Sequence, residues 1–199
     1  SYPQLLRGVR ARYPPLNLKA LTALELNHLT KVARLSTREV LTALREAGLD
    51  SMPGGGAEVF DDRVHDEVFK GKLRADGWME VHRVAHELGI KTNATILYGH
   101  VETREERTRH LLALRELQRQ SPGFQTIIPL SFIPEGSELG HLPGNTGLED
   151  LKMLAISRLM LDNFDHVKAF WIMQSMKLSQ VSLNWGVDDL DGTVVWYDI

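Results

Sequence analysis

Residues 95–102 (Thr-Ile-Leu-Tyr-Gly-His-Val-Glu) place a glycine, a histidine and a carboxylate directly after an apolar run. Gly99 lets the backbone turn sharply, and His100 and Glu102 then supply a proton carrier and an acceptor. A capping-box pattern that starts a helix follows from Thr103. In parallel α/β sheets, ligands bind beyond the carboxyl ends of strands, so this turn is a candidate binding site. An ordinary strand-to-helix turn explains these eight residues alone equally well.

A second candidate is the segment 53–58, Pro-Gly-Gly-Gly-Ala-Glu, which follows a short apolar run. Gly54, Gly55 and Gly56 allow the backbone to approach a ligand closely, and Glu58 supplies a carboxylate for a ribose or an amino-acid ammonium. The segment is not a Walker loop, because the lysine and the Ser/Thr are missing. It is not a dinucleotide-binding fingerprint, because no helix opens on the third glycine. A flexible turn is the alternative interpretation.

Two further groups of residues, a histidine pair and an acidic run, have spacings that could form a metal site or line a binding site. His82 and His86 lie four residues apart, a spacing that can bind zinc. The glutamate of zinc proteases is missing after the first histidine, and we expect solvated histidines on an outer helix and no metal site. Asp188, Asp189 and Asp191 form an acidic run, which is usually a solvated face but would line a site at a strand end.

Composition bounds the class of protein. The 199 residues are 43% hydrophobic and 25% charged, which suits one globular domain or a large part of one. The net charge of -3 gives no basic field for nucleic acid. No apolar run reaches membrane-spanning length and no secretion signal opens the sequence, so we expect a cytoplasmic protein. Cysteine is absent, which excludes disulfides and thiolate ligands within these residues.

Strand-like and helical patterns alternate along the chain. The patterns predict strands at 16–26, 49–52, 90–98, 124–132 and 166–173, helices at 1–12, 36–47, 76–88, 104–120, 146–163 and 177–185, and a long loop at 134–147. This alternation predicts βαβ units and a parallel sheet. A complete (β/α)8 barrel needs about 250 residues. We therefore predict an α/β fold, a partial TIM-like (β/α) barrel with about five to six parallel strands. It forms a single domain over residues 1–199 and is the middle and later part of a larger barrel.

Three ordered motifs, at residues 48–58, 97–103 and 183–193, resemble the radical S-adenosylmethionine (SAM) enzymes of the futalosine route to menaquinone. The resemblance covers essentially the whole chain. In that superfamily a strand with the pattern Gly-x-Ile-x-Gly-x-x-Glu supports the adenine of the cofactor. The matching positions here are Thr95, Leu97, Gly99 and Glu102. The first glycine and the isoleucine of the pattern are therefore replaced.

The resemblance implies a role for each candidate residue. The residues expected to bind SAM are Gly54, Gly55, Gly56, Glu58, Thr95, Leu97, Gly99 and Glu102. Catalytic roles are expected for His100 and Glu58, and no residue is expected to bind a metal. The residues expected to contact the substrate are Tyr98, Phe132, Trp171, Asp188 and Asp191. For the three aromatic side chains, core packing is the alternative interpretation, because such side chains bury large areas.

The resemblance also implies a reaction and its partners. A transferase of this family adds the 5'-deoxyadenosyl radical of SAM to the double bond of 3-[(1-carboxyvinyl)oxy]benzoate, and rearrangement and decarboxylation give aminofutalosine. It needs a 4Fe-4S cluster on a Cys-x3-Cys-x2-Cys loop and an electron donor such as flavodoxin or ferredoxin. Since this chain has no cysteine, we expect the cluster ligands outside it and expect the chain alone to be inactive.

Two alternatives to this reaction stay open. The sister cyclase that acts on dehypoxanthine futalosine shares both glycine motifs, although residues 162–171 and 188–194 look more like the enzyme that makes aminofutalosine. A non-catalytic, ligand-binding barrel fragment is the alternative from a different class. A cysteine loop in the full open reading frame would favour an enzyme.

Overall fold

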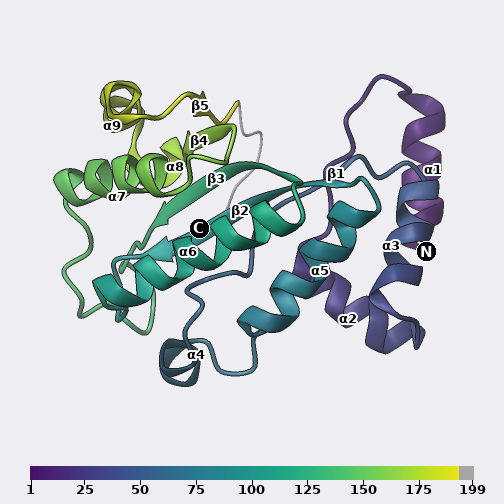
Figure 1. The fold of residues 1–199 in the computed structure, drawn as a ribbon, viewed down its shortest axis with the longest axis horizontal. Coiled ribbons are helices and arrows are strands. Elements are labelled where there is room, and N and C mark those ends of the chain that lie inside the picture. The colour runs from purple at the N-terminus through teal and green to yellow at the C-terminus, as the bar shows by residue number, and fades with distance from the viewer. Residues whose placement is uncertain (193–199) are drawn as a thin grey trace.

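The computed structural model describes residues 1–192, whose five strands form one wholly parallel sheet in chain order (Figure 1). The strands are β1 (Ser51–Met52), β2 (Lys91–Tyr98), β3 (Phe124–Ser131), β4 (His166–Ala169) and β5 (Asp189–Leu190). Helices connect each pair of neighbouring strands, as parallel pairing requires. A sheet of this order is part of a (β/α) barrel, so the predicted partial TIM-like barrel is confirmed. Residues 193–199, which the prediction also assigned to the barrel, lie outside the described residues.

The helices lie along the sheet from β1 to β5. They are α1 (Tyr2–Arg12), α2 (Ala23–Ala33), α3 (Thr37–Glu46), α4 (Asp62–Val68), α5 (Ala75–Glu87), α6 (Arg104–Gln120), α7 (Gly147–Met160), α8 (Trp171–Gln174), α9 (Met176–Ser182) and the 3-10 turn η1 (Leu183–Trp185). In Figure 1 the helices α1 to α3 gather beside β1, α5 and α6 run along the middle of the sheet, and α7 to α9 lie beside β4 and β5. No helix within residues 1–192 combines the length and the apolar character needed to cross a membrane.

The strand predicted at 16–26 is wrong for most of its length. Within it, Lys19 makes an isolated parallel bridge to Ser51, and α2 begins at Ala23. Thr22 accepts a hydrogen bond from the Glu25 amide and completes a capping box, which starts the helix. An apolar run of this length is compatible with a strand or with a buried helix segment, and the capping residues decide for the helix.

One strand boundary also differs from the predicted one, and one short helix has no counterpart among the predicted elements. The strand predicted to end at residue 173 ends at Ala169, and α8 begins at Trp171. Helix α4 was not predicted at all, because it has only seven residues and little apolar periodicity. Both differences concern short helices, whose local sequence pattern is weak.

The two faces of β2 have different roles. Thr92 and Tyr98 bond to side chains of α5 and α7, so they point toward the helices. Because side chains alternate along a strand, Thr95 and Leu97 lie on the opposite face. That face is the interior side of a barrel, and there the register places Thr95 opposite Ile128 of β3. The interior face therefore carries two of the predicted SAM positions.

The expectation of solvated histidines on α5 is wrong, because His82 is 0% exposed and His86 is 8% exposed. Their spacing places both on the apolar stripe of α5, which packs against β2. His86 Nδ1 donates to the Ser121 carbonyl at 2.7 Å. The Thr92 hydroxyl lies between the two rings, 2.8 Å from His86 Nε2 and 2.9 Å from His82 Nδ1. Burial lowers the pKa of both rings, that of His86 to about 4. Both are neutral core groups.

Candidate functional site

The two glycine-containing segments lie side by side at the carboxyl edge of the sheet. The chain after β1 continues along β2, where the Thr95 hydroxyl donates to the Gly54 carbonyl at 2.7 Å. The Leu97 amide donates to the Glu58 carbonyl at 3.0 Å. Glu58 is thereby held next to the end of β2, where the turn at Gly99 begins. The structure brings together the two segments that the sequence singled out.

Glycine is required at Gly54 because the loop is pressed onto the backbone of β2. A Cβ at Gly54 would lie 2.6 Å from the Asn93 carbonyl oxygen and 2.8 Å from the Ala94 carbonyl carbon. Gly56 has a φ of +88°, which side chains rarely adopt. The triplet therefore allows close packing and a sharp change of direction, and both bring Glu58 to the strand edge.

His110 holds the same loop from the helix side. Its Nδ1 accepts a hydrogen bond from the Phe60 amide at 3.1 Å, and its Nε2 donates to the Thr95 carbonyl at 2.9 Å. The Phe60 ring stacks on the imidazole with 4.0 Å between ring centroids. The ring is fully buried, which lowers its pKa to about 3. His110 is thus a neutral link between α6, β2 and the loop that carries Glu58.

The carboxylate of Glu58 receives an ammonium group in this structure. Its side chain is 14% exposed, and its Oε1 lies 2.7 Å from Lys72 Nζ. Lys72 lies 4.9 Å from the centre of the Phe69 ring. A carboxylate at a strand edge that accepts one ammonium group can accept the ammonium group of a ligand in the same way.

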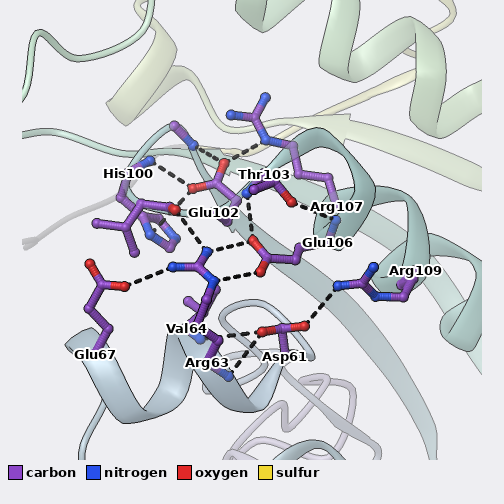
Figure 2. Close-up of polar contacts among 12 residues, drawn as sticks. Asp61, Arg63, Val64, Glu67, His100, Glu102, Thr103, Glu106, Arg107 and Arg109 are labelled. Atoms are coloured by element: carbon purple, nitrogen blue, oxygen red, sulfur yellow. Dashed lines mark hydrogen bonds and ion pairs between the residues drawn. The ribbon is translucent and has the colours of Figure 1, made fainter.

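The turn after β2 is closed by Glu102, as Figure 2 shows. The Glu102 carboxylate accepts hydrogen bonds from the Gly99 amide at 2.6 Å, the His100 amide at 2.9 Å and Arg107 Nε at 2.5 Å. Its side chain is fully buried. Gly99 has a φ of +92°, and a Cβ there would lie 2.0 Å from the side chain of Asn145. The backbone of the turn is therefore fixed by several independent contacts.

His100 is a buried ring beside two aromatic side chains. Its Nε2 donates to the Leu97 carbonyl at 3.1 Å, and its Nδ1 lies 3.3 Å from the Glu102 carboxylate. Phe69 and Phe132 contact it edge-on, with centroid distances of 5.4 and 5.9 Å. Burial lowers its pKa, although Glu102 opposes this shift. The His100 imidazole therefore connects the turn after β2 with Phe69 and Phe132 at the carboxyl edge of the sheet.

The three aromatic residues predicted to contact the substrate have different surroundings. Tyr98 is 0% exposed; its hydroxyl donates to Asp150 at 2.6 Å and accepts from Gln174 at 3.2 Å. Burial and the nearby carboxylate raise its pKa well above the usual value. Phe132 and Trp171 are partly exposed beyond β3 and at the start of α8. Tyr98 lies on the helix side of β2, while Phe132 lies beside His100.

The aspartates near β5 also separate into two places. Asp188 precedes β5 and so lies at its amino end, where it accepts from the Val167 amide at 2.9 Å and pairs with Arg158 at 2.7 Å. Asp191 follows β5 and lies 3.6 Å from Lys168 Nζ, whose side chain is 15% exposed. Burial raises the pKa of Asp191. Of these two, Asp191 is at the same edge of the sheet as the glycine segments.

Arg63 ties α4 to the start of α6, and no sequence pattern indicates this role (Figure 2). Arg63 donates to both Glu106 oxygens, at 2.8 and 2.7 Å, and to the Val101 carbonyl at 3.0 Å. These bonds lower the pKa of Glu106 to about 2. Glu106 is the fourth residue of the capping-box pattern that starts at Thr103, but Arg63 lies 43 residues earlier and no spacing rule links the two.

Comparison with known protein families shows that the chain belongs to the radical SAM superfamily, which agrees with the partial (β/α) barrel. The model of that superfamily matches residues 10–114, and a second family, described as the CofH/MqnC C-terminal region, matches residues 121–197. The superfamily uses SAM and a 4Fe-4S cluster held by cysteine thiolates. None of the 199 residues is a cysteine, so this chain has no thiolate that could bind the cluster.

Particular relatives share the sequence over nearly its whole length. The chain is 53% identical over 198 residues to the aminodeoxyfutalosine synthase of Thermus thermophilus and 42% identical over 208 residues to that of Streptomyces coelicolor. It is 39% identical over 201 residues to a 5-amino-6-(D-ribitylamino)uracil--L-tyrosine 4-hydroxyphenyl transferase 2 of Methanosarcina mazei. These alignments cover 98%, 100% and 98% of this chain. The chain spans about half the length of these relatives, namely 53%, 54% and 52%.

Proposed function

We propose that the complete protein is a radical SAM transferase that joins the 5'-deoxyadenosyl group of SAM to 3-[(1-carboxyvinyl)oxy]benzoate and forms aminofutalosine for menaquinone biosynthesis. The observation that carries this proposal is the 53% identity to an aminodeoxyfutalosine synthase over 98% of the chain. The identity to the methanogen transferase is 39%, so the synthase is the better-supported relative. An electron donor such as flavodoxin or ferredoxin is part of the proposal.

In this proposal the carboxyl edge of the sheet binds SAM. Glu58 takes the ammonium of SAM, in the position that Lys72 occupies in this structure. The adenine lies along the end of β2, against Leu97 and the backbone at Gly99. The carboxylate of Glu102 already has three protein donors, so its role is to hold the turn in shape. Bound in this way, SAM contributes the group that is transferred.

The benzoate would lie beside the partly exposed aromatic side chains. The Phe132 ring would pack against the aromatic substrate. Trp171, the first residue of α8, lies just beyond the end of β4. His100, buried against Phe132, orients this wall through its bonds to the turn. An apolar wall of this kind excludes water from reactive intermediates. Tyr98 supports the site from the helix side through its bond to Asp150.

The cluster belongs to another part of the protein in this proposal. The chain has no thiolate to offer, so the cluster ligands are proposed to lie outside these residues and the chain alone to be inactive. Its contribution is to bind and orient SAM and the benzoate at one edge of a half-barrel.

Carbon-labelled SAM tests the proposed reaction in the complete enzyme. With the benzoate present, we expect the label in a product of the size of aminofutalosine, because the adenosyl skeleton is incorporated. A reaction without the benzoate is the control. Label found only in free 5'-deoxyadenosine, with the benzoate unchanged, would contradict the synthase and favour the cyclase, which releases that nucleoside.

A further inference from the structure

Lys168 lies on the interior face of the half-barrel, in the same layer as Thr95. The register places Thr95 of β2 opposite Ile128 of β3, and the register of β3 with β4, extended by one residue, places Ile128 beside Lys168. Lys168 in turn pairs with Asp189 of β5. Neighbours in register point to the same face of a sheet, so Lys168 and Asp189 both point into the barrel.

The ammonium group of Lys168 is held by two carboxylates. Its side chain is 15% exposed, and its Nζ lies 3.1 Å from Asp189 Oδ2 and 3.6 Å from Asp191 Oδ1. An ammonium group that is shielded from water and paired in this way keeps its charge and its direction. Lys168 therefore places a fixed positive charge inside the half-barrel.

Lys19 brings a second ammonium group to the same place from the other edge of the sheet. Its backbone bridges to Ser51, so it lies at β1, whereas Lys168 lies in β4. Partial burial lowers the pKa of Lys19, and the Lys168 ammonium lowers it further, while Asp189 and Asp191 raise it. Charges at opposite edges of a sheet act on each other in this way when the sheet curves and both lie on its concave side. The two lysines therefore face each other across the interior.

A carboxylate is the ligand group that this pair of lysines favours. The two like charges disfavour each other, and both aspartates form ion pairs with Lys168. Lys19 forms no ion pair within residues 1–192, so its three donors can turn toward a ligand. A carboxylate between the two ammonium groups would offset their repulsion and accept charge-assisted hydrogen bonds from both.

We propose that Lys19 and Lys168 bind the ring carboxylate of the benzoate substrate between their ammonium groups. This inference rests on the proposed function, which places SAM at the loops that follow β1 and β2. The double bond that takes up the adenosyl group must lie at those loops. Lys168 is in the layer of Thr95, one layer deeper in the barrel than Leu97. The ring carboxylate is at the other end of the substrate from the double bond, so it is the carboxylate that reaches the lysines.

Two shortened ligands separate the two carboxylates of the benzoate. The ligand α-phenoxyacrylate keeps the enol ether and its carboxylate but lacks the ring carboxylate. The ligand m-vinyloxybenzoate keeps the ring carboxylate and lacks the other one. If the lysines bind the ring carboxylate, replacing either of them should weaken the binding of the benzoate and of m-vinyloxybenzoate and leave that of α-phenoxyacrylate unchanged.

The experiment measures the binding of the three ligands to the complete, cluster-loaded protein by isothermal titration calorimetry, with SAM present and no reductant, so that no turnover occurs. We expect the original protein to bind the benzoate about tenfold to a hundredfold more tightly than α-phenoxyacrylate, the range for one charged hydrogen bond. In Lys19→Met this preference should fall by a similar factor. Because Lys19 forms no ion pair within residues 1–192, folding should be kept.

Three further variants sharpen the test. Lys168→Met should lower the preference as Lys19→Met does, and Lys168→Arg, which keeps the charge beside both aspartates, should retain most of it. Lys152→Met, at an exposed position of α7, should bind all three ligands like the original protein. A circular dichroism melt of each variant checks that the fold is kept.

Each other outcome counts against a particular part of the account. If Lys19→Met and Lys168→Met both keep the full preference, the lysines only support the strand ends, and the inference is wrong. If these variants instead lose affinity for α-phenoxyacrylate, the other carboxylate lies here, which also contradicts the inference. If the original protein binds the benzoate and α-phenoxyacrylate equally well, the proposed function stands and the inference fails. If the original protein binds none of the three ligands, the proposed function is wrong and the inference with it.

Discussion

Gly54→Ala is expected to lower the free energy of unfolding by about 3 kcal/mol or more, at the upper end of what overpacking usually costs. The added Cβ would lie 2.6 Å from the Asn93 carbonyl oxygen, and backbone in the middle of a sheet cannot move aside as a side-chain end can. Gly54 has no left-handed φ, so the close approach alone produces the effect. Urea unfolding of this 199-residue chain, followed by circular dichroism, measures the change.

The neighbouring Gly55→Ala is the matched control for this prediction. A Cβ at Gly55 would lie 3.3 Å from the Cγ2 methyl of Thr22, which is the end of a side chain and can shift by a few tenths of an ångström. We expect a loss of about 1 kcal/mol or less, the lower end of overpacking costs. Equal stabilities for the two variants would show that the loop is not pressed against β2 as the structure has it.

The chain is also expected to lose about 4 kcal/mol of stability between about pH 7.5 and about pH 5 through His86 and His110 alone. Burial lowers their pKa values to about 4 and about 3 in the folded state, below the ordinary value of 6.5. The unfolded chain therefore binds protons below pH 6.5 that the folded chain does not, and stability falls as the pH falls. Glu106, with a pKa of about 2 against 4.5 when unfolded, loses its own contribution only at lower pH.

His110→Gln isolates one of these contributions. The variant should be less stable than the original chain at about pH 7.5, because the Phe60 amide and the Thr95 carbonyl lose a well-placed partner. The stability difference between the two pH values should shrink by about 2 kcal/mol, the share of one buried histidine. His28→Gln, at an exposed position of α2, controls for the loss of an imidazole. An unchanged pH dependence in His110→Gln would show that His110 is accessible to protons in the folded chain.

Those elements whose signals are local were predicted well from the sequence. Helix α6 begins after the Thr103 capping box and ends just before Pro122, and its predicted bounds agree with the structure. Helix α3 begins directly after Ser36, which forms the corresponding capping box with Glu39 in the first turn of the helix. Helix α4 is too short for a clear periodic pattern, and the bond from Arg63 to Glu106 that docks it joins residues distant in sequence.

The candidate site shows the same division between local and distant information. The glycine triplet and the Gly99 turn have local patterns and were singled out from the sequence, and the structure places them side by side. Their partners lie far along the chain: Lys72 is 14 residues from Glu58, and His110 is 50 residues from Phe60. The direction of Tyr98 could have been inferred, because alternation along β2 separates it from Leu97. The histidines of α5 are buried because His82 and His86 share a helical face with Trp78, Val81 and Ala85, and that apolar stripe packs against β2.

The affinity of the complete protein for SAM after Glu58→Gln tests the central claim most directly, namely that the carboxyl edge of this half-barrel binds SAM. Glutamine keeps the size of the side chain and removes its charge. We predict a loss of about tenfold to a hundredfold in affinity, the range for one charged hydrogen bond. The melting temperature should fall only slightly, because the lost ion pair with Lys72 is partly exposed. Glu138→Gln, in the exposed loop before α7, should bind SAM like the original protein. Unchanged affinity in Glu58→Gln would contradict the account and leave Glu58 as the partner of Lys72 alone.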